Sequence, residues 1–506
     1  MANTGFKTYA QDHGGRVALL FLLFLLALYQ LYSAGFSAFV LVCITPIIVL
    51  AIIAAFRFRM LLFWALFAIN YLIQMHGGPL TGVPPSVPNE LIELMLIAIA
   101  LVISDGYPFH RLNNVMFLTL GIWCFFCSLE VLNDTCSLGI NIGAWYTGAR
   151  MMAFQLMYAF IVYTLYISTP NYLIKYLYFW GAFAFFAAFW VWKQKNIGFT
   201  HTEESWVMGP GYSTHVLQGG TLTRYFSIYS DAANFGIGIA STAVAFIIFG
   251  ITSKLRRLRW IFLTVGIACV WATFPSGTRT AIACMGVGFM FYILLSKNLR
   301  IAVPFSIVFA SAFFILAFTN IGNGNQQIRR MRSAFDKNDA SANQRSINQE
   351  VMKKYLKDAP WGIGMGLSSK DVPANNKFKI MSYIPPDSEY VFIWIHTGII
   401  GISIFLIVTA LMILGASWIV FFKLKSPSLR GIGAGFVCAM VSQQLGGYGN
   451  QVLMQFPNCL VFYGGLAIVY VLPHIEQEWI AYENKELEKQ EEKKRLKLEK
   501  KRASRV

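Results

Sequence analysis

Long apolar runs alternate with short polar segments along almost the whole chain. Most runs approach or reach the roughly 17 to 25 residues that an α-helix needs to cross a membrane. The pattern therefore predicts an all-α polytopic membrane protein with about 12 to 14 transmembrane helices. The predicted spans are residues 17–34, 36–55, 59–76, 91–104, 114–132, 150–168, 172–192, 231–252, 259–275, 279–296, 300–318, 388–422, 431–447 and 453–473.

Two segments depart from this alternation. Residues 319–386 are mostly polar, and they predict one large loop that carries short helices outside the lipid, where irregular backbone is tolerated. Residues 476–506 are rich in Glu, Lys and Arg, and they predict a charged cytoplasmic tail helix. The tail is either a solvated helix or a segment drawn to anionic lipid. We therefore expect a membrane domain over 1–475, including the loop, and a separate tail.

Composition and charge agree with the apolar pattern. The chain is 56% apolar and only 13% charged, which is typical of a multi-pass membrane protein and not of a soluble domain. Its net charge of +17 comes from the tail and the short loops, so no soluble basic domain exists that would bind nucleic acid. The eight cysteines lie mostly inside apolar runs. Their spacing predicts neither a disulfide framework nor a metal site, and we expect no cofactor.

The short loops alternate between basic and non-basic. The short loops at 77–90, 133–149, 275–278 and 448–452 contain no Lys or Arg. The loops between them carry the basic residues Arg57, Arg59, Arg111, Lys175, Lys254, Arg256, Arg257, Arg259, Lys297, Arg300, Lys423, Lys425 and Arg430. Because basic loops stay in the cytoplasm, this pattern predicts cytoplasmic termini and an outward-facing 319–386 loop.

Three arginines on the predicted outer side are candidates for binding an anion. Arg224 precedes a span, Arg279 begins another, and Arg345 lies in the first turns of a short helix in the large loop. An arginine near the exposed backbone N–H groups of a helix start binds phosphate oxygens well, often through two parallel hydrogen bonds. The alternative is that each arginine reaches to lipid headgroups or pairs with a local acid.

The short helix of the large loop is predicted from its amphipathic pattern. Ile347, Val351 and Tyr355 recur at helical spacing and predict its apolar face, and Pro360 predicts its end. The following stretch, Gly362-Ile-Gly-Met-Gly-Leu-Ser368, is a glycine-rich turn without the strand and lysine that a nucleotide-binding loop needs.

The start of the next span offers acidic candidates. Asp387 follows two prolines and is expected to be the N-cap of the helix, with Glu389 and Tyr390 just inside it. Asp387 is either a cap or a base that accepts a proton. His396 lies about 13 Å further along the same helix, at 1.5 Å per residue. A lone histidine there is expected to pack inside the protein or to make a structural hydrogen bond.

Several of these motifs, in this order, resemble the bacterial O-antigen ligase and O-antigen polymerase (Wzy-like) superfamily. The motifs are Arg224 ahead of Asp231-Ala-Ala-Asn-Phe235, Ser276-Gly-Thr-Arg-Thr-Ala281, Arg345, Pro360-Trp-Gly-Ile-Gly-Met-Gly366 and Gly398-Ile-Ile-Gly401. The resemblance covers about residues 222 to 410. It departs from the ligases at Asp387, followed by Ser388, where they have a catalytic histidine that is usually followed by asparagine. This departure favours a polymerase-like member.

The resemblance implies a GT-C-like membrane glycosyltransferase in the bacterial cytoplasmic (inner) membrane, with its active site facing the periplasm. It would polymerise undecaprenyl-diphosphate-linked oligosaccharide in O-antigen or exopolysaccharide biosynthesis, with a glycan acceptor, membrane lipid and a chain-length regulator protein as partners. It would invert the anomeric configuration without a metal. Asp387 and Arg279 would be catalytic, and Arg224, Arg345, Glu389 and Tyr390 would bind the diphosphate and glycan.

Two other functions remain compatible with the sequence. The first is ligase-type transfer of the glycan to an acceptor that is not a lipid carrier. The second is transport of a glycan lipid or an organic anion, which interrupted spans in corresponding halves of the chain would favour. The interruptions here lie mainly in one half.

Overall fold

The computed structural model describes residues 14–34, 50–78, 86–217, 220, 222–296, 340–384 and 388–503, and short pieces at 300, 303–304, 307–308, 310–311, 314–315, 319–324, 328–329 and 332. The chain divides into two compact units, Met1–Ala65 and Leu66–Val506. The first unit contains α2 (Gly14–Ala34), an apolar helix. It also contains a helical piece, Leu50–Arg57, which meets α4 (Arg59–Leu72) at a bend of 100°.

The second unit is built almost entirely from helices. The remaining α-helices are α5 (Ser86–Val102), α6 (Val115–Leu129), α7 (Ile142–Ala149), α8 (Gln155–Tyr166), α9 (Pro170–Asn196), α10 (His201–Met208), α11 (Tyr212–His215), α12 (Ala232–Thr252), α13 (Arg256–Thr273), α14 (Arg279–Leu295), α17 (Ala340–Leu356), α18 (Glu389–Trp418), α19 (Pro427–Gly449) and α20 (Asn458–Ala503). The 3-10 and π turns are η1 (Ser104–Gly106), η2 (Phe109–Leu112), η3 (Glu130–Leu132), η4 (Arg150–Phe154), η6 (Phe274–Ser276), η8 (Lys379–Ser382) and η9 (Ile419–Lys423). Two short antiparallel strands, β1 (Val216–Leu217) and β2 (Leu222–Thr223), pair with Val216 opposite Thr223.

This architecture confirms the predicted all-α polytopic membrane fold. Among the described residues, six helices are long and apolar enough to cross a membrane, or seven if the bent pair at α4 is one span. The predicted spans at 36–55 and 300–318 lie largely outside the described residues. The total of about 12 to 14 spans therefore stays a prediction.

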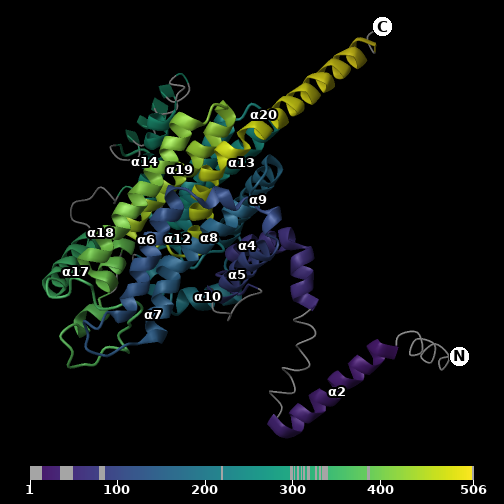
Figure 1. Cartoon of the computed structure of the whole chain (residues 1–506). Helices are drawn as coiled ribbons and strands as arrows, with labels where there is room; N and C mark the ends of the chain where they lie inside the picture. The colour runs from purple at the N-terminus through teal and green to yellow at the C-terminus, as the bar shows by residue number, and fades with distance from the viewer. Residues whose placement is uncertain are drawn as a thin grey trace. The chain divides into compact units, whose positions relative to one another are not determined.

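Helix α12 lies at the centre of the second unit and packs against α13, α14 and α19 (Figure 1). Small residues allow the close approach of α12 and α19, as is common between membrane helices. A Cβ atom at Gly435 of α19 would collide with the ring of Phe249, and one at Gly446 would collide with Ile237, both on α12. This packing fixes the ends of α12, α14 and α19 relative to one another.

Several basic loops lie along α20 at one end of these helices. Lys254, after α12, forms an ion pair with the buried Glu483 of α20 at 2.9 Å. The backbone N–H of Lys425, before α19, donates to Glu476 of α20 at 2.7 Å. Helix α20 runs without a break from the last predicted span into the charged tail (Figure 1). The buried contacts of α20 therefore continue into the segment predicted as the charged tail, as far as Glu483.

At the other end of these helices, part of the large loop folds around its own apolar core. Met352 and Leu356 of α17 are buried there, with Ile363 and Phe378. The predicted apolar face of α17 is confirmed at Tyr355, which packs against this core, but not at Ile347, which is 55% exposed; Met352 and Leu356 are buried instead. The register could not be read from spacing alone, since the turn at 359–363 decides which side of α17 is covered.

Helix α18 is broken at Gly398, and the glycine-rich turn fills the break. Gly398 has φ 64° and ψ −167°, a conformation that residues with a Cβ atom rarely adopt. The carbonyl of Pro360 accepts from the N–H of Ile400 at 3.3 Å, and the N–H of Ile363 donates to the carbonyl of Ile395 at 2.9 Å. A Cβ atom at Gly362 would lie 2.5 Å from the nitrogen of Gly398. The turn is thus a packing element that joins the loop to α18.

Candidate functional site

Arg279 is presented by a tight turn between two membrane helices. Helix α13 ends at Thr273, the η6 turn follows, and Gly277 adopts φ 58°, the left-handed conformation that lets the chain reverse. Thr278 is extended at the N-cap position, and Arg279 is the first residue of α14. Thr278 is buried, whereas Arg279 is half-buried. The guanidinium group therefore stands near the positive end of the α14 dipole, where an anion is stabilised.

Arg224 holds this turn in place. Its Nε donates to the carbonyl of Ser276 at 3.2 Å, and its two terminal nitrogens donate to the carbonyl of Thr214 and to Oγ1 of Thr278, each at 2.9 Å. Thr278 Oγ1 in turn donates to the carbonyl of Ala232 at 2.7 Å. The two predicted arginines are thus brought together, with Arg224 bracing the turn that carries Arg279.

His215 is a buried part of the same support and was not predicted from the sequence. Its Nε2 accepts from the backbone N–H of Ala232 at 3.0 Å, so the proton lies on Nδ1, which is 3.1 Å from the carbonyl of Gly211. Burial, and then the charge of Arg224, lower the pKa of His215 to about 4. The histidine is therefore neutral at pH 7. No local motif marks it, because its partners come from the start of α12.

The start of α18 is fixed against α19 and the loop that follows α19. Ser388 occupies the N-cap position, where Asp387 was expected, and its hydroxyl donates to the carbonyl of Gly447 at 3.1 Å. Glu389 is buried, and Oε2 accepts from the backbone N–H of Leu453 at 3.0 Å. The Tyr390 hydroxyl lies 2.9 Å from the carbonyl and from Oε1 of Gln444.

The end of α19 contacts both predicted parts of the site. It contacts the start of α18 through Ser388 and Tyr390, as described above. It also contacts the start of α14, because a Cβ atom at Gly449 would lie 2.7 Å from Oγ1 of Thr280. The start of α14, which carries Arg279, and the start of α18, which carries Glu389, therefore both contact the end of α19. Their separation along the sequence gave no sign of this arrangement.

The remaining predicted residues are less closely connected. Arg345 is half-buried on α17. Within the described part of the chain, no hydrogen bond or ion pair joins its side chain to Arg224, Arg279, Glu389 or Tyr390. Asp387, the predicted base, lies outside the described residues. Its role and that of Arg345 stay predictions.

A cavity of about 380 Å³ lies beside His396, between the glycine-rich turn, α7, η4 and α18. Its lining includes the hydroxyl-bearing residues Thr147, Ser368 and Ser382. His396 Nδ1 lies 2.9 Å from the carbonyl of Gly364. Because a carbonyl only accepts, Nδ1 carries the proton in the neutral ring and Nε2 is left as an acceptor. His396 is buried and hydrogen-bonded, as expected, and it also lines this cavity, which the sequence did not indicate.

The fold and site define an all-α polytopic membrane protein with a folded loop beside the ends of its central helices. Residues 267–406 match the family model Wzy_C, described as O-antigen ligase. The match supports the O-antigen ligase and polymerase superfamily and a membrane enzyme of O-antigen-related glycan transfer. It includes Arg279, Arg345, Asp387, Glu389 and Tyr390, and it ends before α19. A comparison with curated proteins finds no match.

Proposed function

We propose that this protein is a glycosyltransferase that polymerises undecaprenyl-diphosphate-linked oligosaccharide units on the outer side of the bacterial cytoplasmic membrane. The proposal depends on one observation. Arg279 is the first residue of α14, it lies within the family-matched segment, and the loop before it, 275–278, contains no Lys or Arg. A guanidinium group at a helix start suits a diphosphate, because both the side chain and the helix dipole stabilise negative charge.

The proposed reaction needs a cation and a base. The acceptor hydroxyl attacks the anomeric carbon, the bond from that carbon to the diphosphate oxygen breaks, and a base takes the hydroxyl proton. Arg279 stabilises the negative charge on the departing diphosphate, without a metal. Arg224 braces the Arg279 turn, and Ser388, Glu389 and Tyr390 fix the start of α18.

Two residues compete for the role of base. Asp387 is the candidate from the family resemblance, since it stands where the ligases have histidine. His396 is the candidate from the structure, since its ring lines the cavity beside the glycine-rich turn. The serine and threonine hydroxyls of that cavity suit a sugar acceptor. We propose Asp387 as the base and His396 as the alternative.

Two experiments test the proposal. Deletion of the gene followed by glycan profiling distinguishes a polymerase from a ligase. Single repeat units at the cell surface indicate a polymerase, and polymer retained on the lipid carrier indicates a ligase. The purified protein is then incubated in detergent micelles with lipid-linked repeat units. A polymerase lengthens the glycan without two membrane compartments, whereas a transporter leaves the units unchanged. Unchanged units with folded protein contradict the proposal.

A further inference from the structure

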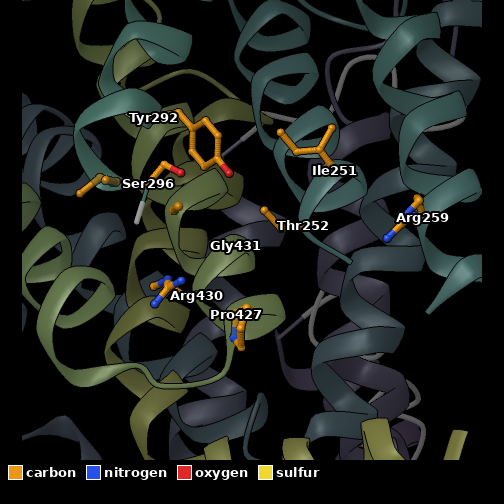
Figure 2. Close-up of a pocket in the computed structure, with 10 residues that line it drawn as sticks. Ile251, Thr252, Arg259, Tyr292, Ser296, Pro427, Arg430 and Gly431 are labelled. Atoms are coloured by element: carbon orange, nitrogen blue, oxygen red, sulfur yellow. The ribbon is translucent and has the colours of Figure 1, made fainter. Parts of the chain in front are cut away.

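A second cavity, of about 280 Å³, lies at the opposite end of α14 from Arg279. The two ends of this helix are roughly 24 Å apart, at 1.5 Å per residue. The cavity is formed by the last residues of α12 and α14 and the first turns of α13 and α19, as Figure 2 shows. It therefore lies among the basic loops, which the positive-inside rule places on the cytoplasmic side.

Two arginines from different helices line this cavity (Figure 2). Arg259 of α13 is pinned, because Nε and one terminal nitrogen donate to the carbonyl of Ser253 at 3.1 and 2.8 Å. Arg430 of α19 is half-buried, and in the described part of the chain no acceptor is hydrogen-bonded to its guanidinium group. A half-buried cation without an acceptor is costly, so the site favours a bound anion.

Two acidic residues of α20 that contact the adjacent basic loops are engaged elsewhere. Glu476 accepts the backbone N–H groups of Lys425 and Ser426, each at 2.7 Å. Glu483 is paired with Lys254 at 2.9 Å. No Asp or Glu is among the described residues that line the cavity. The charge of its two arginines is therefore not neutralised by a carboxylate in the lining.

The lining also identifies the kind of anion. Hydroxyl groups of Thr252, Tyr292 and Ser296 surround the same space, and the Tyr292 hydroxyl points into it (Figure 2). The Thr252 hydroxyl donates to the carbonyl of Ile248 at 2.7 Å, so the two arginines and the Tyr292 hydroxyl are the donors that suit the oxygens of a phosphate group. Ile251 and Leu295 add apolar surface beside them, which suits the first acyl-chain carbons of a phospholipid.

We propose that this cavity binds a phosphate group, and that the headgroup of an anionic phospholipid of the inner leaflet is the source. Basic pockets between membrane helices on the cytoplasmic side are a known way to hold such headgroups. A soluble phosphate compound has the same chemistry and is the other source that the test separates. The proposal does not depend on the transferase activity.

The first test compares variants with the same change of charge. The full-length protein is reconstituted with phosphatidylcholine and a minor amount of phosphatidylglycerol, and retained lipid is measured by native mass spectrometry after delipidation. The variant carrying Arg259→Gln and Arg430→Gln should retain about tenfold less phosphatidylglycerol than wild type, because charge-assisted hydrogen bonds are lost. The control carries Arg256→Gln and Arg257→Gln, which lie in the exposed first turn of α13 and outside the cavity lining. Equal retention in both variants would overturn the proposal.

The second test uses wild-type protein and so does not depend on how the variants fold. A phosphatidylglycerol that carries a photoreactive group near its headgroup is crosslinked to the reconstituted protein, and the adducts are mapped by peptide mass spectrometry. Adducts at 251–259, 292–296 and 427–434 support the site, and adducts only elsewhere contradict it. Adducts that persist in millimolar inorganic phosphate assign the site to lipid, whereas adducts lost there assign it to soluble phosphate.

Discussion

At the scale of single residues, two arginines of similar sequence context have different surroundings. All three guanidinium nitrogens of Arg224 donate to Ser276, Thr214 and Thr278. Arg279 is the first residue of α14 and is half-buried at the helix end. The same residue type therefore braces the turn in one place and, in the proposed function, stabilises the charge of the diphosphate in the other. Substitution by lysine separates these roles, because lysine keeps the charge and loses the planar set of donors.

Arg279→Lys should lower polymer formation about 10²- to 10³-fold, as expected when one contact to the transition state worth about 2.7 to 4 kcal/mol is lost. Its melting temperature should stay near that of wild type. Arg224→Lys is the matched comparison and should lower the melting temperature as well as activity, because it loses bonds to the turn. Activity is measured as glycan polymer in a deletion strain at equal protein level. Wild-type polymer in Arg279→Lys would show that Arg279 only reaches to lipid headgroups.

The base is tested by two conservative substitutions. Asp387→Asn should lower polymer formation by roughly 10²- to 10⁴-fold with folding intact, because the amide does not accept a proton. His396→Asn removes Nε2 while an amide nitrogen can still donate to the carbonyl of Gly364. It should therefore retain most activity. A silent Asp387→Asn together with an inactive, folded His396→Asn would make His396 the base.

His215 should make stability depend on pH. Its pKa is lowered from the usual 6.5 to about 4 by burial and by Arg224, so the unfolded chain binds more protons between these values. Stability is complete above about pH 6.5 and falls as the pH drops toward about 4, by roughly 1 to 3 kcal/mol. Melting temperatures in detergent between pH 7 and 5 should fall more for wild type than for His215→Gln. Identical slopes in the two proteins would contradict this role.

At the scale of elements, the break in α18 couples the large loop to the membrane helices. Helix α18 lets the Pro360 carbonyl approach Ile400 only because Gly398 adopts a positive φ and carries no side chain. The same docking creates the cavity beside His396. A packing defect at this point should therefore affect both stability and activity, although the turn itself contains no ionisable residue.

Gly398→Ala should destabilise the protein by about 1 to 3 kcal/mol or more, because an alanine there is strained and its Cβ would collide with the Pro360 carbonyl. It should also lower polymer formation by displacing the turn from α18. Gly121→Ala in α6 is the control, since a Cβ atom there meets nothing within 4 Å. Thermal unfolding in detergent gives the melting temperature of both variants. Equal melting temperatures for the two variants would show that the turn does not depend on the break.

At the scale of the whole molecule, the second unit has two chemically different ends. Arg279 and the start of α18 lie at one end, beside a folded loop core. Arg259, Arg430 and the contacts of α20 with the basic loops lie at the other. Glycan transfer on the outside and phosphate binding on the inside are therefore separate proposals, and the sidedness that both use is itself testable.

A cysteine at Asn323 in the large loop should react with an impermeant thiol reagent in intact spheroplasts. A cysteine at Arg256, which is exposed at the start of α13, should react only after the membrane is opened. Labelling is read by a mass shift, with the unsubstituted protein as control for its own cysteines. The reverse pattern would invert the topology and place Arg279 in the cytoplasm.

The sequence alone determined the class of the protein and the position of most helices. Apolar runs of spanning length predict helices because lipid offers no partner for an open backbone, and this information is local. The order of motifs around the large loop also indicated the superfamily, which the match over 267–406 supports. Helix starts such as Arg279 could be placed because a Gly and a Thr precede an apolar run.

Only the tertiary structure decided which side chains meet. His215 joins Ala232, Glu389 joins Leu453, and Arg259 and Arg430 share a cavity, although the members of each pair belong to different elements of the chain. The choice of Met352 over Ile347 for the core of the loop was settled in the same way. Such contacts depend on how helices pack and on where small residues let them approach, and a one-dimensional pattern does not contain that geometry.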